Sequence, residues 1–153
     1  MKIDWMNHTG FVVRDMERSL AFYRDLLGFE EERNGIVEGE YIAGVSGFPG
    51  AKMHIVYLGI GDRKHSVELI QYLNPRGEQI APTERNAVGA AHLGFIVPDA
   101  DAIYRELSAK GVKFVGAPAV RANAQYPWAH KACYFEDPDG NWLELIERAP
   151  EPA

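Results

Sequence analysis

Short runs of alternating apolar and polar residues, interrupted by two stretches of helical spacing, make up most of the chain. In residues 99–111, Ile103 and Leu107 lie four positions apart, which places both on one face of a helix. In residues 15–27 four apolar residues are spaced four, three and four positions apart, which again predicts one helical face. They are Met16, Leu20, Tyr23 and Leu27. The pattern therefore predicts two amphipathic helices.

Each helical stretch has residues suited to begin and end it. Asp15 and Asp99 are expected to be N-caps, because a short carboxylate accepts hydrogen bonds from the first free N–H groups of a helix. Gly28 and Gly111 are expected to end the helices, since glycine readily adopts the left-handed conformation that follows a last turn. A strand is expected before each helix and three after it, the later ones near residues 39–43, 52–58 and 66–73, and near 113–115, 131–135 and 142–147.

The two halves of the chain resemble each other. Residues 8–15 and 92–99 are identical at five of eight positions and lie 84 residues apart. Residues 67–70 and 143–146 also match, as Val-Glu-Leu-Ile and Leu-Glu-Leu-Ile. A repeat of this length indicates a duplicated structural unit.

The repeat predicts an α+β fold built from two tandem β-α-β-β-β modules. Each module is expected to form a curved mixed sheet with its helix on the outer face, and the inner faces are expected to line a shared cleft. A turn-rich stretch between the halves, with two prolines and two glycines, is interpreted as a linker. We expect one domain of 153 residues, with module one at about 4–74, the linker at 75–89, module two at 90–147 and a tail at 148–153.

A histidine stands in the first predicted strand of each module, and a glutamate in the last. Because strand side chains alternate between faces, His8 shares a face with Gly10, and each glutamate lies opposite the apolar residues that flank it. Taken singly, such residues are usually structural or exposed, but a duplicated half-site predicts these corresponding places. Two imidazoles and two carboxylates suit a divalent Zn, Ni, Co, Fe or Mn ion, so we expect a metal site formed by His8, Glu68, His92 and Glu144.

Composition restricts the partners. The net charge is −6, and an acidic chain without a basic cluster is not expected to bind nucleic acid. Cys133 is the one cysteine, lies in a strand-like run, and is expected to be a buried structural residue. No apolar run is long enough to span a membrane, and the first residues do not read as a secretory signal. We expect a soluble cytoplasmic protein without a membrane partner.

Four segments carry a family resemblance: HTGFVV at 8–13, SLAFYRDLLGF at 19–29, AHLGF at 91–95 and FEDPDGNWLEL at 135–145. In these segments the chain resembles the vicinal oxygen chelate superfamily, which includes glyoxalase I, extradiol dioxygenases and bleomycin-resistance proteins. The resemblance implies a paired β-α-β-β-β fold around one divalent ion, and a homodimer. It places the ligands at His8, Glu68, His92 and Glu144, a set similar to that of bacterial glyoxalase I.

The resemblance also implies a reaction. Members chelate a small substrate through two neighbouring oxygens, and in glyoxalase-like members a metal-bound glutamate moves the proton. Glu144 or Glu68 is the candidate base here. The resulting hypothesis is an isomerase or lyase. One alternative is an Fe(II)-dependent extradiol dioxygenase, although a second glutamate ligand would occupy a position that oxygen and catecholate need. The other alternative is a metal-free small-molecule binding or resistance protein, which four retained ligand types disfavour.

Further residues are candidates for contact with a small-molecule substrate. His54 could orient a substrate if it faces the cleft, although a mid-strand histidine is often structural. A loop with aromatic residues precedes the seventh strand, and loops of this kind often border pockets. Its side chains could instead cover the sheet edge. The candidates are His54, Tyr126, Trp128 and His130, and the alternation leaves open whether Tyr41, Met53 and Tyr57 also line the pocket.

Overall fold

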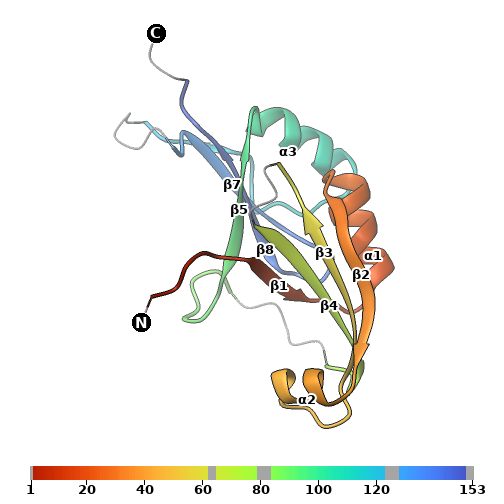
Figure 1. Cartoon of the computed structure of the whole chain (residues 1–153). Coiled ribbons are helices and arrows are strands. Elements are labelled where there is room, and N and C mark those ends of the chain that lie inside the picture. The colour runs from red at the N-terminus through yellow and green to blue at the C-terminus, as the bar shows by residue number, and fades with distance from the viewer. Residues whose placement is uncertain (1, 62–64, 79–83, 123–127, 151–153) are drawn as a thin grey trace. The chain divides into compact units, whose positions relative to one another are not determined.

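A computed structural model describes residues 2–61, 65–78, 84–122 and 128–150 of the chain (Figure 1). The chain divides into two compact units, Met1–Ala81 and Pro82–Ala153. The boundary falls within the stretch 75–89 that the sequence suggested as a linker. No helix among the described residues is long and apolar enough to cross a membrane.

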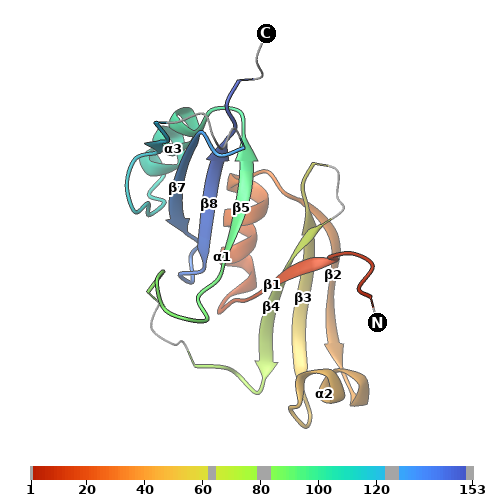
Figure 2. The same cartoon turned by 90° about the vertical axis from the view of Figure 1, so that its left-hand side faces the viewer.

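The first unit is a four-stranded mixed sheet in the order β1-β4-β3-β2, with β1 parallel to β4 and the other pairs antiparallel. In both views α2 lies at the end of β2 and β3 (Figures 1 and 2). The elements of the first unit are β1 (His8–Val12), α1 (Met16–Leu20), η1 (Ala21–Leu26), β2 (Glu30–Glu38), α2 (Glu40–Ser46), β3 (Lys52–Gly59) and β4 (Ser66–Asn74).

The second unit repeats this topology in the order β5-β8-β7-β6, again with the first strand parallel to the last. Helix α3 contacts β7 and β8. The elements are β5 (His92–Val97), α3 (Ala100–Ala109), β6 (Ala119–Val120), β7 (Lys131–Glu136) and β8 (Trp142–Glu147). Two mixed sheets of the same connectivity confirm the predicted α+β fold of two β-α-β-β-β modules.

The predicted helix caps are also confirmed. Oδ1 of Asp15 accepts a hydrogen bond from the N–H of Arg18 at 2.9 Å. Oδ1 of Asp99 accepts one from the N–H of Ala102 at 2.8 Å. Gly28 follows the first helix with φ of +81°, a conformation that favours glycine. The chain reversals after the first strand of each module are therefore determined locally.

The first helix differs from a uniform α-helix in its second half. After α1, the wider π-helical segment η1 follows, with the N–H of Leu27 bonded to the carbonyl of Phe22 at 3.0 Å. Tyr23 lies in this segment and is fully buried, packed against Phe11 and Phe29. The π-turn thus places an aromatic ring in the core of the unit.

Two predicted strands are wrong. Residues 39–43 belong largely to helix α2, and the second strand of the first unit is β2, which precedes it. Because β2 has a single neighbour and is almost wholly exposed, its sequence lacks the apolar alternation of a half-buried strand. Residues 113–115 make only an isolated bridge, between Phe114 and Phe135, and the edge strand is the short β6.

Each unit has a hydrophobic core between its sheet and its helix, and the first unit has a second buried cluster that includes Ile42 of α2, Ala51 and Met53. In the first unit, the helical residues Met16, Leu20 and Tyr23 are buried against the sheet. The buried sheet residues on that face are Val56, Leu58, Val67 and Leu69. In the second unit the corresponding residues face α3 and are Cys133, Phe135, Leu143 and Leu145. By strand alternation the opposite face carries the histidines and glutamates, and there Val12 and Ile96 are 57% and 54% exposed.

Candidate functional site

The first unit brings one predicted histidine and one predicted glutamate into contact. His8 begins β1, and Glu68 lies on the neighbouring strand β4, where it pairs with Gly10 rather than with His8 itself. The carboxylate reaches back along the strand, so that Oε2 of Glu68 lies 3.0 Å from Nε2 of His8. The alternation of β1 and the parallel register of β1 with β4 produce this pair.

The other nitrogen of His8 is engaged by its neighbour. Nδ1 of His8 lies 2.8 Å from Oδ1 of Asn7. Because an amide oxygen only accepts hydrogen bonds, Nδ1 carries the proton in this contact. Nε2, the atom that faces Glu68, is the nitrogen available to a metal ion, and a metal-binding imidazole commonly has its second nitrogen held by an acceptor.

The second unit repeats the pair. His92 begins β5, and Glu144 on β8 pairs with Gly94. Nε2 of His92 and Oε2 of Glu144 are 3.3 Å apart. The side chain of Glu144 is 17% exposed, compared with 10% for Glu68, so each carboxylate is largely sheltered but reachable from the sheet surface.

A glycine is the register partner of each glutamate. A β-carbon at Gly10 would lie 3.3 Å from Oε2 of Glu68. At Gly94 it would lie 3.5 Å from Oε2 of Glu144 and 3.0 Å from Cδ1 of Ile146. In the first module the glycine of His-x-Gly therefore leaves space for the glutamate oxygen, whereas in the second it leaves space chiefly for the side chain of Ile146.

A tyrosine lies against each pair. The ring of Tyr57 stands edge-on to His8 at 5.5 Å, and its hydroxyl donates a hydrogen bond to Glu68. Burial, together with this bond and the charge of Glu68, raises the pKa of Tyr57 to about 12. Tyr57 therefore stays a neutral hydrogen-bond donor over the physiological range.

Tyr134 occupies the equivalent place in the second unit, edge-on to His92 at 5.0 Å and paired across the strands with Glu144. Burial and the charge of Glu144 raise its pKa, while Arg85 lowers it. The sequence analysis did not identify Tyr134. The signal that reveals it is again the repeat, because Tyr57 and Tyr134 each stand opposite the glutamate of their module.

Each unit thus supplies two potential metal ligands. Within the part of the chain that the structure describes, no group of three or more His, Cys, Asp or Glu side chains suited to a metal ion is gathered. The donor types nevertheless fit a borderline divalent ion, since an imidazole nitrogen and a carboxylate oxygen face the same point in each unit.

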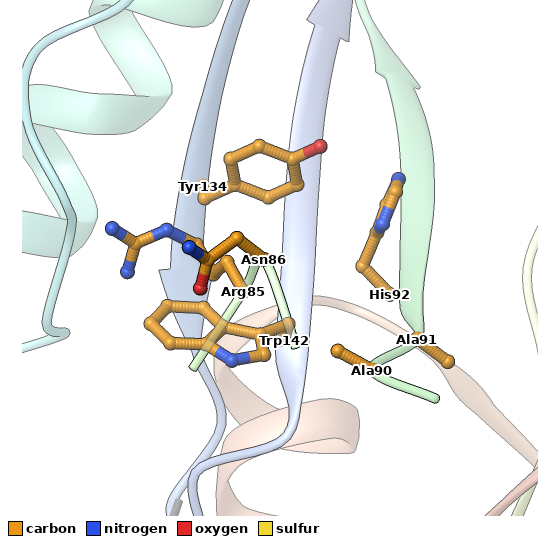
Figure 3. Close-up of a pocket in the computed structure, with 7 residues that line it drawn as sticks. All are labelled: Arg85, Asn86, Ala90, Ala91, His92, Tyr134 and Trp142. Atoms are coloured by element: carbon orange, nitrogen blue, oxygen red, sulfur yellow. The ribbon is translucent and has the colours of Figure 1, made fainter. Parts of the chain in front are cut away.

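The pair in the second unit adjoins a pocket (Figure 3). The cavity has a volume of about 200 Å³. The guanidinium carbon of Arg85 lies 4.7 Å from the centre of the Trp142 ring, and Trp142 itself is buried. The lining residues are Arg85, Asn86, Ala90, Ala91, His92, Tyr134 and Trp142.

The other predicted substrate contacts lie elsewhere or outside the described residues. His54 lies three residues before Tyr57 on β3, so the two side chains point to opposite faces of the sheet, and His54 faces away from Glu68. Its Nε2 lies 2.6 Å from Oδ1 of Asn34. Tyr126 lies outside the described residues.

Trp128 and His130 precede β7. Trp128 is 58% exposed, and the N–H of His130 bonds to the carbonyl of Glu147 at 2.8 Å. Glu147 is the last residue of β8, whereas Trp142, in the pocket, is the first. His130 therefore lies at the end of the sheet away from the pocket.

Comparison with known proteins identifies the family. The sequence profile of the Glyoxalase/Bleomycin resistance protein/Dioxygenase superfamily matches residues 5–145. The chain therefore belongs to this superfamily, as the resemblance to vicinal oxygen chelate proteins indicated.

Individual relatives agree with this assignment. The uncharacterized protein YwbC of Bacillus subtilis is 26% identical over 150 residues, covering 94% of this chain and 97% of the relative. A lactoylglutathione lyase of Neisseria meningitidis is 28% identical over 144 residues, covering 92% and 88%. The crystal structure of a glyoxalase family protein from Bacillus cereus matches with a TM-score of 0.84 at 25% identity, covering 98% of this chain and 97% of that chain.

Proposed function

We propose that this protein is a divalent-metal-dependent enzyme of the glyoxalase-like type. One observation carries the proposal: the same imidazole–carboxylate pair forms twice, in the same strand register, each time with a glycine as the register partner of the glutamate. Protein metal sites for zinc-like ions use at least three protein ligands. Both pairs are therefore needed for one ion of Zn, Ni, Co, Fe or Mn, held by His8, Glu68, His92 and Glu144.

The chemistry proposed is proton transfer next to an oxygen-bearing carbon. When bound, the ion supplies Lewis-acid stabilisation to a substrate oxygen that becomes negatively charged. Glu144 is the proposed base that takes the proton and returns it to a neighbouring atom. It is favoured over Glu68 because its partner His92 borders the pocket, whereas Glu68 is more buried and accepts the Tyr57 hydroxyl. The outcome is an isomerase or lyase reaction.

The similarity to a lactoylglutathione lyase supplies the first assay. Thiol-dependent consumption of methylglyoxal is measured after metal removal and reloading with each of the five ions. Metal-dependent turnover supports the proposal. Oxygen uptake with catechols under Fe(II) would instead favour an extradiol dioxygenase. A protein that binds none of the five ions would contradict the proposal and favour a metal-free binding protein.

We further propose that the protein acts as a homodimer. Mixing two variants tests whether the four metal ligands come from one chain or from both. Neither His8→Ala nor His92→Ala chains retain all four ligands. If one chain supplies all four, a mixture of the two variants binds no more metal than either alone. If the ligands come from two chains, mixed dimers contain one intact site, and metal binding returns. Sedimentation analysis of each variant controls for loss of the dimer.

A further inference from the structure

We infer that the pocket beside His92 binds the carboxylate of a small organic acid, with Arg85 as the residue that determines this specificity. The inference rests on the proposed function in one respect: the same molecule is taken to be the substrate. The pocket and its charge are features of the second unit alone.

Arg85 gives the pocket its positive charge. Among the described residues that line it, Arg85 alone carries a permanent charge, and none of the described carboxylates forms an ion pair with it. The chain as a whole has a net charge of −6, so Arg85 is a local positive charge on an acidic chain, at the side of the pocket away from His92 and its partner Glu144. A planar guanidinium matches a carboxylate with two parallel hydrogen bonds, and such charge-assisted pairs are strong.

Trp142 holds this guanidinium in place. The guanidinium carbon lies 4.7 Å from the ring centre, within the range of a cation–π interaction. Trp142 is 9% exposed and fixed in β8, so the ring is a rigid support. Arg85 is thereby pre-organised, which reduces the side-chain entropy lost when an anion binds.

The rest of the pocket restricts the body of the ligand. In Figure 3, Arg85 and His92 stand at the two sides, with the rings of Tyr134 and Trp142 between them. Because Arg85 already lies over the ring of Trp142, the ring of Tyr134 is the aromatic surface left for an apolar ligand body. The volume of about 200 Å³ is below that of most drug-sized sites, which favours a small ligand. The ligand is therefore a small organic acid, with its carboxylate at Arg85 and its other end at His92.

Benzoate and benzamide are the probes, because they share size and shape but differ in charge. Binding is followed by the fluorescence of Trp142 in a Trp5→Phe/Trp128→Phe background, for the full chain as purified and again after metal removal. We expect benzoate to bind about 10- to 100-fold more tightly than benzamide, the range for hydrogen bonds to a charged group. In Arg85→Gln this preference disappears, and in Arg85→Lys it is partly retained.

The matched control is Arg105→Gln, which removes the same charge from α3 of the same unit, outside the pocket lining. It should keep the preference, and all variants should keep the melting temperature of the parent. Equal binding of the two probes, or an unchanged preference in Arg85→Gln, would overturn the inference. The preference for benzoate is also measured in the metal-free protein. If the protein proves to bind no metal, the anion-binding inference is therefore still tested on its own.

Discussion

Gly10 lies directly beneath the carboxylate of Glu68, where a β-carbon would come within 3.3 Å of Oε2. At Gly94 a β-carbon would lie at ordinary contact distance from Oε2 of Glu144, 3.5 Å, and would instead crowd Cδ1 of Ile146 at 3.0 Å. Because the glycine and the glutamate are register partners in each unit, their closeness is determined by strand pairing. The glycine is thus as specific a mark of the site as the histidine two residues before it.

Gly10→Ala should weaken metal binding more than it changes stability. The added methyl group displaces Oε2 from its place beside His8, and disturbing the support of a ligand typically costs about 10- to 100-fold in metal affinity. Calorimetric titration of the metal-free protein measures this. Gly35→Ala is the matched control, because a β-carbon at that strand residue would have open space within 4 Å and should leave the affinity unchanged. Equal affinities for both variants would contradict the role given to Gly10.

Glu144→Gln should reduce turnover by about 10²- to 10⁴-fold, the usual contribution of a general base. The amide keeps the shape of the side chain and one oxygen, but does not accept a proton at neutral pH. Single-turnover rates at saturating metal separate this loss from weakened metal binding. Glu68→Gln, compared under the same conditions, should retain more activity; the reverse order would show that Glu68 is the base.

Asp101→Asn should lower the melting temperature near neutral pH but not in acid. Lys131 donates a hydrogen bond to Asp101 at 2.7 Å, and this bond holds the pKa of the Asp101 carboxyl below its usual value. A carboxyl with a depressed folded-state pKa stabilises the fold above its unfolded pKa of about 4 and loses that contribution as the pH falls through the folded value. Melting curves of both proteins should therefore begin to converge below about pH 4 and coincide once the pH is well below the folded value. A difference that persists there would contradict the ion-pair explanation.

Cys133 should react slowly with thiol reagents in the native protein. It is buried in β7, and burial, with smaller contributions from Glu144 and Asp101, raises the pKa of the Cys133 thiol to about 11. At about pH 8 an ordinary cysteine is substantially ionised, whereas Cys133 is roughly one part in a thousand thiolate. Alkylation should be about 100-fold slower than in the unfolded chain. A rate equal to that of the unfolded protein would show that the core opens freely around β7.

The repeat made the two pairs predictable from sequence. His8 and His92 begin strands whose alternation is clear, and the parallel pairing of first and last strands places each glutamate next to them. The Asp15 and Asp99 caps are equally local, because a cap depends on residues three positions apart. These features needed only strand period and helix-end chemistry.

Edge strands and the pocket were not predictable in this way. Strand β2 is charged and exposed, so its sequence resembles a loop. Arg85 lies in the stretch interpreted as a linker, where a charged residue reads as solvated, and its contact with Trp142 joins residues far apart in the sequence. Whether a strand residue such as Tyr134 faces a histidine depends on register, which only the folded sheet defines.

Metal titration of the metal-free protein tests the central claim most directly. We predict one ion per chain, with binding weakened at least about 100-fold by His8→Ala and equally by His92→Ala, because one ion requires both pairs. Two ions per chain, each sensitive to only one of the substitutions, would contradict the account by showing that the two pairs are independent sites.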